Sequence, residues 1–183
     1  MRLAATQANQ ITRRHKRNML KIIKLLACIL ALGLCIPERG MIPVQNATAK
    51  DWNSQSFWYS PWGKSGVHKG IDIFAKQGTP VIASTNGLVI YTGNLRMGGN
   101  VVMVLGPKWR IYYYAHLDRI YSKTFNWVSR GEFIGTVGSS GNAAGKPPHL
   151  HFSVLTLIPY PWRFSHQTQG WKKMFFVNPT DGF

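Results

Sequence analysis

The chain has 183 residues, of which 45% are apolar and 13% aromatic, enough for one well-buried core but too few for two ordinary domains. Its formal net charge of +16 is distributed unevenly along the chain. Residues 1–40 hold eight of the 22 basic residues and one of the six acidic ones, and residues 41–183 have a net charge of +9. This balance favours an anionic partner, such as nucleic acid, a membrane surface or an acidic wall polymer.

Residues 1–36 have the order of an export signal, in which basic "RRHKRNMLKIIK" precedes an apolar run from Leu25 to Ile36. The run is shorter than the ~20 residues that a membrane-spanning helix needs, so we predict a signal peptide, with an uncleaved anchor as the alternative. We therefore expect a periplasmic or cell-envelope protein that meets a membrane only through this segment, if the segment stays uncleaved. The two cysteines, Cys28 and Cys35, both lie here, which excludes disulfides and thiolate metal sites from the rest of the chain.

Residues 37–51 are predicted to form a flexible linker and residues 52–183 a single domain. From residue 79 onward, short β-branched and aromatic runs alternate with Gly, Asn and Pro, which predicts an all-β fold of antiparallel strands joined by hairpins. In "TPVIASTNGLVIYTG", two apolar runs flank Asn86-Gly87, a strong hairpin signal. "NVVMVLGPKWRIYYYAH" repeats the arrangement around Gly106-Pro107.

A later strand is predicted to begin after two prolines, at "HLHFSV". Side chains alternate along a strand, so His149 and His151 are expected on one face, about 6.6 Å apart, with Leu150 in the core. Two imidazoles on one face suit a metal or a proton-transfer site, although an isolated His-x-His more often serves neither. The stretch after this strand, residues 158–183, has no clear period and is expected to cover a face or rim of the sheet.

"GVHKGIDIFA" offers two more candidate ligands, His68 and Asp72. On a straight strand they would lie about 13 Å apart, too far to share a metal whose bonds are about 2 Å long. The chain must therefore bend between them, which Gly70 permits. Ile71 and Ile73 alternate with the aspartate, so they can enter the core while the carboxylate faces a groove.

"WRIYYYAHLD" contains His116, which has the same strand parity as Tyr112 and Tyr114. A histidine and two phenols are thus expected to line one surface, and the alternative is an edge histidine beside ordinary sheet tyrosines. Four of the six histidines and one aspartate fall in or beside predicted strands. This combination favours a functional site over coincidence.

Residues 57–155 resemble the lysostaphin-like (LytM-type) zinc metallopeptidases, which cut cell-wall peptides. The resemblance is carried by "SPWG", "HKGIDI", "GTPVIASTNGLV", "GGNVVMV", "YYYAHL" and "GTVGSSG" with "PPHLHF", which occur in the family's order and spacing, and by "VNPTDGF" near the end. It implies the duplicated hybrid motif, an open sandwich of antiparallel β-sheets with a substrate groove. Two departures stand out: many members have Glu where this chain has Ser153, and the segment after Ile158 is longer than usual.

Carried over position by position, the resemblance implies that His68, Asp72 and His151 bind zinc and that His116 and His149 are the catalytic pair beside it. The spacing of "HLH" alone does not say which histidine binds the metal. Two histidines and one carboxylate leave a fourth position for water, as in catalytic zinc sites. Such a water loses a proton at a pH of about 7.

The chain has no His-Glu-x-x-His motif, so neutral histidines must take the proton of the water. We assign His149 as the general base and His116 to the developing oxyanion, and the two roles can be exchanged. Tyr112 or Tyr114 is a candidate for an additional hydrogen bond.

These inferences predict a monomeric, zinc-dependent endopeptidase that hydrolyses peptide bonds in the stem or cross-link peptides of peptidoglycan. One alternative is a non-catalytic scaffold or activator of wall hydrolases with the same fold, but all three ligand positions and both catalytic histidines are present. Another is a basic nucleic-acid binder that uses aromatic stacking. The export segment and the clustered ligands weigh against nucleic acid, and the bond that is cut is left open.

Overall fold

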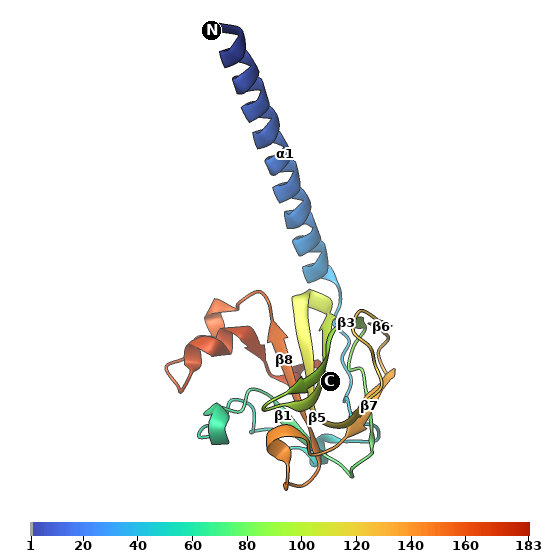
Figure 1. Ribbon diagram of the computed structural model, residues 1–183. Coiled ribbons are helices and arrows are strands. Elements are labelled where there is room, and N and C mark those ends of the chain that lie inside the picture. The colour runs from blue at the N-terminus through green and yellow to red at the C-terminus, as the bar shows by residue number, and fades with distance from the viewer. Residues whose placement is uncertain (1) are drawn as a thin grey trace. The chain divides into compact units, whose positions relative to one another are not determined.

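The computed structural model describes the backbone of residues 2–183 and the side chains of residues 13–183 (Figure 1). It divides into two compact units, Met1–Ile36 and Pro37–Phe183. Helix α1, Arg2–Cys35, belongs to the first unit, and its part Arg13–Cys35 is long and apolar enough to cross a membrane, a test that a signal sequence also passes. This span is longer than the apolar run from Leu25 to Ile36, because it also includes the mixed basic and apolar residues 13–24.

The second unit is all-β, as predicted, and the strand pairs within residues 37–183 are antiparallel. Its strands are β1 (Ile71–Phe74), β2 (Pro80–Ile82), β3 (Gly87–Leu95), β4 (Gly99–Gly106), β5 (Arg110–Ile120), β6 (Trp127–Val128), β7 (Phe133–Val137), β8 (His149–Thr156) and β9 (Phe176–Val177). Short 3-10 helices lie between them: η1 (Ala49–Asp51), η2 (Gly63–Ser65), η3 (Pro107–Trp109), η4 (Gly141–Ala143), η5 (Pro161–Arg163), η6 (Gly170–Phe175) and η7 (Pro179–Gly182).

The strands form one branched sheet with the order β1-β8-β5-β4-β3-β6, in which β7 also pairs with β5 and carries β2 (Figure 1). Strand β8 lies between β5 on one side and, on the other, β1 along its first half and β9 along its second. Fully buried residues of both branches, among them Ile73, Val81, Val104 and Ile134, form a single core. Neighbouring strands therefore hold β8, which carries the His-Leu-His sequence, along both of its edges, and the core packs against it.

One of the two predicted hairpins is present. Strands β4 and β5 pair across the turn at Gly106-Pro107, as expected. The predicted Asn86-Gly87 hairpin is wrong, because β2 pairs with the distant β7 and β3 pairs with β4 and β6. A Cβ atom at Gly87 would lie 2.5 Å from the carbonyl oxygen of Leu105, so the glycine allows close packing on β4 instead of a hairpin turn.

Residues 37–51 pack on the domain, which differs from the flexible linker expected from the sequence. Val44 is a core residue with only 2% of its surface exposed. The carboxylate of Glu38 forms an ion pair with Arg110 and accepts a hydrogen bond from the hydroxyl of Tyr112. This segment completes the core and supplies a partly buried charge, so it is a structural part of the second unit.

Glu38→Ala is expected to lower the free energy of unfolding by roughly 3 kcal/mol, because it leaves the guanidinium of Arg110, 13% exposed, without its carboxylate. Urea unfolding of the full chain, followed by tryptophan fluorescence, measures the change. The control is Glu132→Ala, whose exposed carboxylate accepts one backbone hydrogen bond and whose loss costs about 1 kcal/mol or less. Equal midpoints for the two variants would show that Glu38 does not hold the segment.

The C-terminal segment covers the rim of the sheet, as expected. Val177 of β9 pairs with Val154 of β8, and Gln169 donates a hydrogen bond of 2.9 Å to the carbonyl oxygen of Ser65. His166, in the same segment, is exposed. The segment therefore borders the loop that precedes His68.

Candidate metal centre

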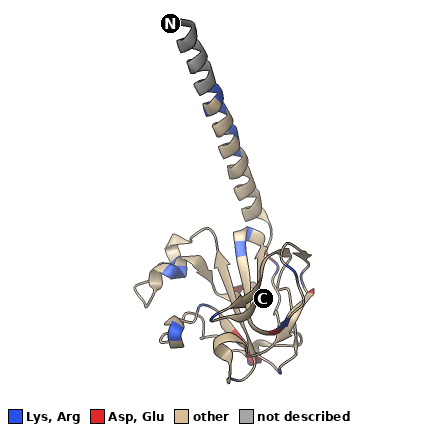
Figure 2. Ribbon diagram, in the orientation of Figure 1, with Lys and Arg blue, Asp and Glu red and all other residues tan. Residues whose placement is uncertain are grey.

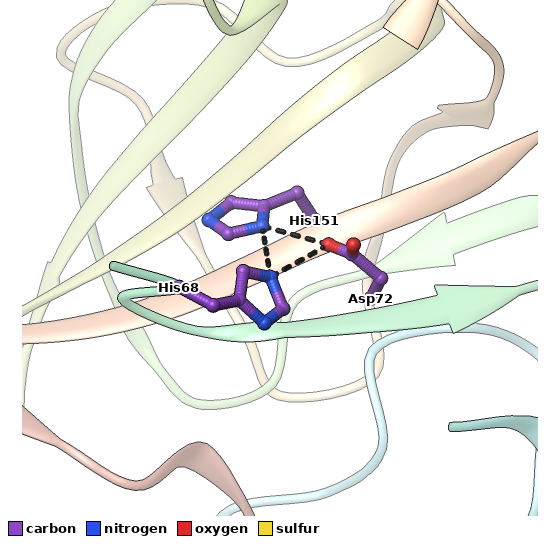
Figure 3. Close-up of side chains that lie close together, drawn as sticks. All are labelled: His68, Asp72 and His151. Atoms are coloured by element: carbon purple, nitrogen blue, oxygen red, sulfur yellow. Dashed lines mark hydrogen bonds and ion pairs between the residues drawn. The ribbon is translucent and has the colours of Figure 1, made fainter. Parts of the chain in front are cut away.

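Three side chains from two neighbouring strands and the loop before them converge at one point (Figure 3). Asp72 of β1 lies directly opposite His151 of β8 in the antiparallel register. His151 Nδ1 lies 2.8 Å from Asp72 Oδ1, and His68 Nε2 lies 3.1 Å from the same oxygen and 3.2 Å from His151 Nδ1. The structure thus brings together all three residues that the sequence predicts as ligands.

The bend that brings His68 to Asp72 lies just before β1, and Gly70 is part of it. A Cβ atom at this position would lie 2.3 Å from the carbonyl oxygen of Phe152 and 2.4 Å from Ser153 Oγ. The glycine is therefore needed because the chain passes very close to β8. The sequence pointed to Gly70 for its backbone freedom, whereas its small size is what the structure uses.

Gly70→Ala is expected to push the start of β1 away from β8 and to separate His68 and Asp72 from His151. We expect a loss of about 1–3 kcal/mol in the free energy of unfolding, as for other overpacked sites, together with weaker metal binding. Urea unfolding and a zinc titration measure the two effects. Gly182→Ala is the control, because its Cβ atom meets nothing within 4 Å, and equal results for both variants would contradict the packing argument.

The outer nitrogen of each ligand histidine is held by an oxygen atom. His68 Nδ1 lies 3.0 Å from the backbone carbonyl oxygen of Ser56, which can only accept. His151 Nε2 lies 3.0 Å from the hydroxyl of Ser153. Metal-binding histidines usually donate their outer N–H to an oxygen in this way, which fixes the ring and its tautomer.

With these outer N–H groups, His68 Nε2, His151 Nδ1 and Asp72 Oδ1 all present lone pairs to one another. Three acceptors within 3.2 Å repel each other unless a shared proton or a metal ion lies among them. Ligand atoms about 2.0–2.2 Å from a tetrahedral zinc ion are roughly 3.3 Å apart, close to these separations. The donor set and its spacing therefore fit a zinc ion.

Electrostatics keep two of the three groups, Asp72 and His151, in the forms that bind metals. Burial alone would raise the pKa of Asp72, but its close contacts with His151 and His68 outweigh burial and lower it, so the side chain is a carboxylate. Burial lowers the pKa of His151, and the opposing effect of Asp72 is smaller, so the ring is neutral at pH 7. Asp72 is also one of few acidic residues in a domain with scattered basic ones (Figure 2).

The two predicted catalytic histidines lie beside this cluster, with their ring centroids 5.1 Å apart. His116 Nδ1 lies 2.9 Å from the carbonyl oxygen of Ser140, and His149 Nδ1 lies 2.8 Å from that of Pro147. Because a carbonyl only accepts, each ring carries a proton on Nδ1 and, when neutral, a lone pair on Nε2. His149 Nε2 lies 3.9 Å from Asp72 Oδ2, so it faces the cluster.

Burial, together with the nearby rings of His151 and His149, lowers the pKa of His116 to about 4. The ring is therefore neutral at pH 7. Both His116 and His149 are 7% or less exposed, so bulk water does not compete strongly for their Nε2 atoms. The pair can accept protons next to a bound metal.

The expectation that His116, Tyr112 and Tyr114 line one surface is wrong. Two residues of β5, Ala115 and His116, lie opposite a single residue of β4, and this bulge turns the histidine to the face of the candidate site. The backbone of His116 has a φ of 64°, in the left-handed region. Both tyrosines point into the core, where the hydroxyl of Tyr114 accepts a hydrogen bond from the amide of Ser84.

Sequence reasoning missed two aromatic residues beside the cluster. Tyr113 lies opposite Ser153 in the sheet, and its ring meets that of His151 edge to face at 6.3 Å. Burial raises its pKa to about 12, so its hydroxyl remains a donor at pH 7. Trp62 stacks on His68 at 4.1 Å. Knowledge of the bulge would have pointed to the tyrosine, but nothing in the spacing indicates the stacked tryptophan.

A groove of about 310 Å³ borders the cluster. Its walls combine aromatic rings with amide and hydroxyl groups, and Asp72 contributes the only charged side chain among the groove's lining residues: Asn53, Gln55, Ser56, Tyr59, Trp62, Asp72 and Phe74. Because the groove opens next to the cluster, it can hold the portion of a bound molecule that extends beyond the cluster.

The family model described as peptidase family M23 matches residues 66–159. An L-Ala–D-Glu endopeptidase of Bacillus subtilis (strain 168) is 38% identical over 128 residues, which cover 61% of this chain and 39% of that protein. The peptidoglycan DD-endopeptidase ShyC of Vibrio cholerae is 37% identical over 93 residues, which cover 51% of this chain and 21% of that protein. This chain thus spans well under half the length of both relatives.

Among solved structures, the catalytic domain of lysostaphin from Staphylococcus simulans is similar, with a TM-score of 0.57 and 26% identity. The match covers 74% of this chain and 97% of that domain. The shared architecture is the antiparallel β fold that positions the cluster described above.

Proposed function

Since the chain belongs to peptidase family M23, we propose that it is a zinc-dependent endopeptidase that hydrolyses peptide bonds in the stem or cross-link peptides of peptidoglycan. The convergence of His68, Asp72 and His151, with three lone pairs directed at one point, is the observation that carries the proposal. The names of the relatives from Bacillus subtilis and Vibrio cholerae support the type of reaction, and the second name supports the substrate class.

His68 Nε2, His151 Nδ1 and Asp72 Oδ1 would hold the zinc ion. When bound, zinc supplies Lewis-acid chemistry, which lowers the pKa of a water to about 7 and polarises a carbonyl group. Nε2 of His149 accepts the proton of the attacking water, while its Nδ1–H remains bonded to the carbonyl oxygen of Pro147. The carboxylate of Asp72 stabilises the imidazolium that forms, and the same Nε2–H then protonates the leaving amine.

His116 is assigned to the oxyanion that develops on the scissile carbonyl. Its Nδ1–H is held by Ser140, so it can donate to the oxyanion only from Nε2, as an imidazolium whose second proton comes from solvent, because the proton of the attacking water goes to His149. Both neutral rings carry a lone pair on Nε2 and have Nδ1–H bonded to a carbonyl oxygen, which is why the roles of His116 and His149 can be exchanged. The protonated hydroxyl of Tyr113 is a further donor on the same face.

The products of peptidoglycan digestion test the proposal. The full chain, purified in detergent, is expected to release peptides with new amino and carboxyl ends, which mass spectrometry of the muropeptides identifies together with the bond that is cut. A chelator should stop the release and added zinc should restore it. Binding of peptidoglycan without release of peptide would favour the non-catalytic scaffold.

We also propose that α1 directs the chain to the periplasm or cell envelope, as a signal peptide or as an anchor, and that the exported protein is a monomer. The length and apolar character of Arg13–Cys35 support this role. N-terminal sequencing of the exported protein separates the two forms. Glu38 is partly buried and paired with Arg110, so a cleaved form is expected to retain it.

A further inference from the structure

We propose that Ser153 is a positioning residue that keeps the ring proton of His151 on Nε2 and thereby leaves Nδ1 free for the metal, an inference that rests on the proposed function. Ser153 is 3% exposed and lies on β8, two residues after His151 and on the same face. Its hydroxyl oxygen lies 3.0 Å from His151 Nε2 and 2.8 Å from the backbone carbonyl oxygen of Lys69.

The direction of these two hydrogen bonds follows from the atoms involved. A hydroxyl has one proton to donate and lone pairs to accept with, whereas a carbonyl oxygen only accepts. The hydroxyl proton of Ser153 must therefore go to Lys69, and the contact with His151 must be an N–H donated by the ring. The proton of the neutral ring is thus on Nε2, and Nδ1 carries the lone pair that faces Asp72.

The surroundings of Ser153 make this arrangement hard to replace. A Cβ atom at Gly70 would lie only 2.4 Å from the serine Oγ, which shows how closely the chain before β1 covers the hydroxyl. With 3% of its surface exposed, the site has little access to water that could take over the hydrogen bonds of a lost hydroxyl. The ring of His151 would then be free to hold its proton on either nitrogen.

The two histidines of the His-Leu-His sequence differ in which ring nitrogen carries the proton. His149 donates Nδ1–H to the carbonyl oxygen of Pro147, so its lone pair is on Nε2. His151 donates Nε2–H to Ser153, so its lone pair is on Nδ1. Two rings on one face of β8 are therefore held in opposite tautomers. Their hydrogen-bond partners decide which ring binds the metal and which accepts a proton, a distinction that the spacing alone does not make.

Ser153→Ala tests the role in two ways. Competition with a chromophoric chelator is expected to show zinc binding weakened by about 10- to 100-fold, the range found when partners of metal-binding histidines are removed. In the metal-free chain labelled with ¹⁵N-histidine, NMR should show the proton of His151 on Nε2 in the wild type and a mixture of tautomers in the variant. The resonances are assigned with a His151→Gln variant.

Two further variants serve as controls. Ser84→Ala removes a buried hydroxyl that donates to the carbonyl oxygen of Met41 at 2.7 Å, with no histidine among its hydrogen-bond partners, and is expected to leave zinc affinity and the His151 tautomer unchanged. Ser153→Thr retains a hydroxyl and is expected to restore the wild-type tautomer. If Ser153 only stabilised the fold, Ser153→Ala and Ser84→Ala would have similar effects on zinc affinity, because each removes a comparable buried hydrogen bond.

The inference is overturned if Ser153→Ala binds zinc as tightly as the wild type, or if the His151 proton of the metal-free wild type is on Nδ1. Failure of the proposed function looks different, because the wild type itself would then bind no zinc. In that case the NMR experiment on the metal-free chain still decides whether Ser153 fixes the tautomer of His151.

Discussion

His151→Ala is expected to abolish zinc binding and peptidoglycan hydrolysis together. The substitution removes one of three ligand atoms that lie within 3.2 Å of one another, and it leaves the carboxylate of Asp72 without its closest partner, at 2.8 Å. Two remaining ligands cannot form the three-ligand site that catalytic zinc requires. Elemental analysis of the dialysed protein and the release of muropeptides from peptidoglycan measure the two losses.

The matched control is His166→Ala, which removes an exposed histidine that contacts only the ring of Phe164 in the interactions described. This variant should retain zinc and activity at the wild-type level. If His151→Ala retained zinc, the metal would have to be held by a different set of residues, and the assignment of the centre would be wrong.

His149→Ala is expected to separate the two properties, with zinc retained and hydrolysis slowed by about 10²- to 10⁴-fold, the usual contribution of a general base. His149 Nδ1–H is bonded to the carbonyl oxygen of Pro147, and its Nε2, 3.9 Å from Asp72 Oδ2, lies outside the group of three ligand atoms that are within 3.2 Å of one another. The rate of muropeptide release under saturating zinc, and the zinc content of the same sample, measure the separation.

His116→Ala provides the comparison for His149→Ala, because its ring has the same Nδ1–H tautomer and lies 5.1 Å from that of His149. It too should retain zinc, and the larger rate loss identifies the general base. Equal loss of zinc in His149→Ala and His151→Ala would overturn the division between ligand and base.

The sequence predicts those parts of the fold that depend on a local pattern of residues. The prediction failed for parts that depend on pairing with strands distant in the chain. The alternation of β-branched and aromatic residues is local, and it predicts the strands and the turn at Gly106. The run before Asn86 also predicts a strand, but its partner β7 begins at Phe133, far along the chain. No local signal specifies that pairing, so the hairpin predicted at Asn86 was wrong.

The same limit applies to the site. His149 and His151 share a face because β8 is a regular strand, so a period of two residues predicts their side correctly. A single extra residue in β5 reverses the side of His116, and parity counted along the sequence cannot detect such a bulge. Ser153 and Trp62 contact the ligand histidines through hydrogen bonding and stacking, and only the assembled structure reveals these contacts.

Diffraction data collected on crystals of the protein at the zinc absorption edge would locate the metal ion among its ligands. We expect an anomalous peak about 2 Å from His68 Nε2, Asp72 Oδ1 and His151 Nδ1, with a fourth position open to solvent. A peak held by other residues, or no peak at these three atoms in a protein that still cuts peptidoglycan, would contradict this expectation.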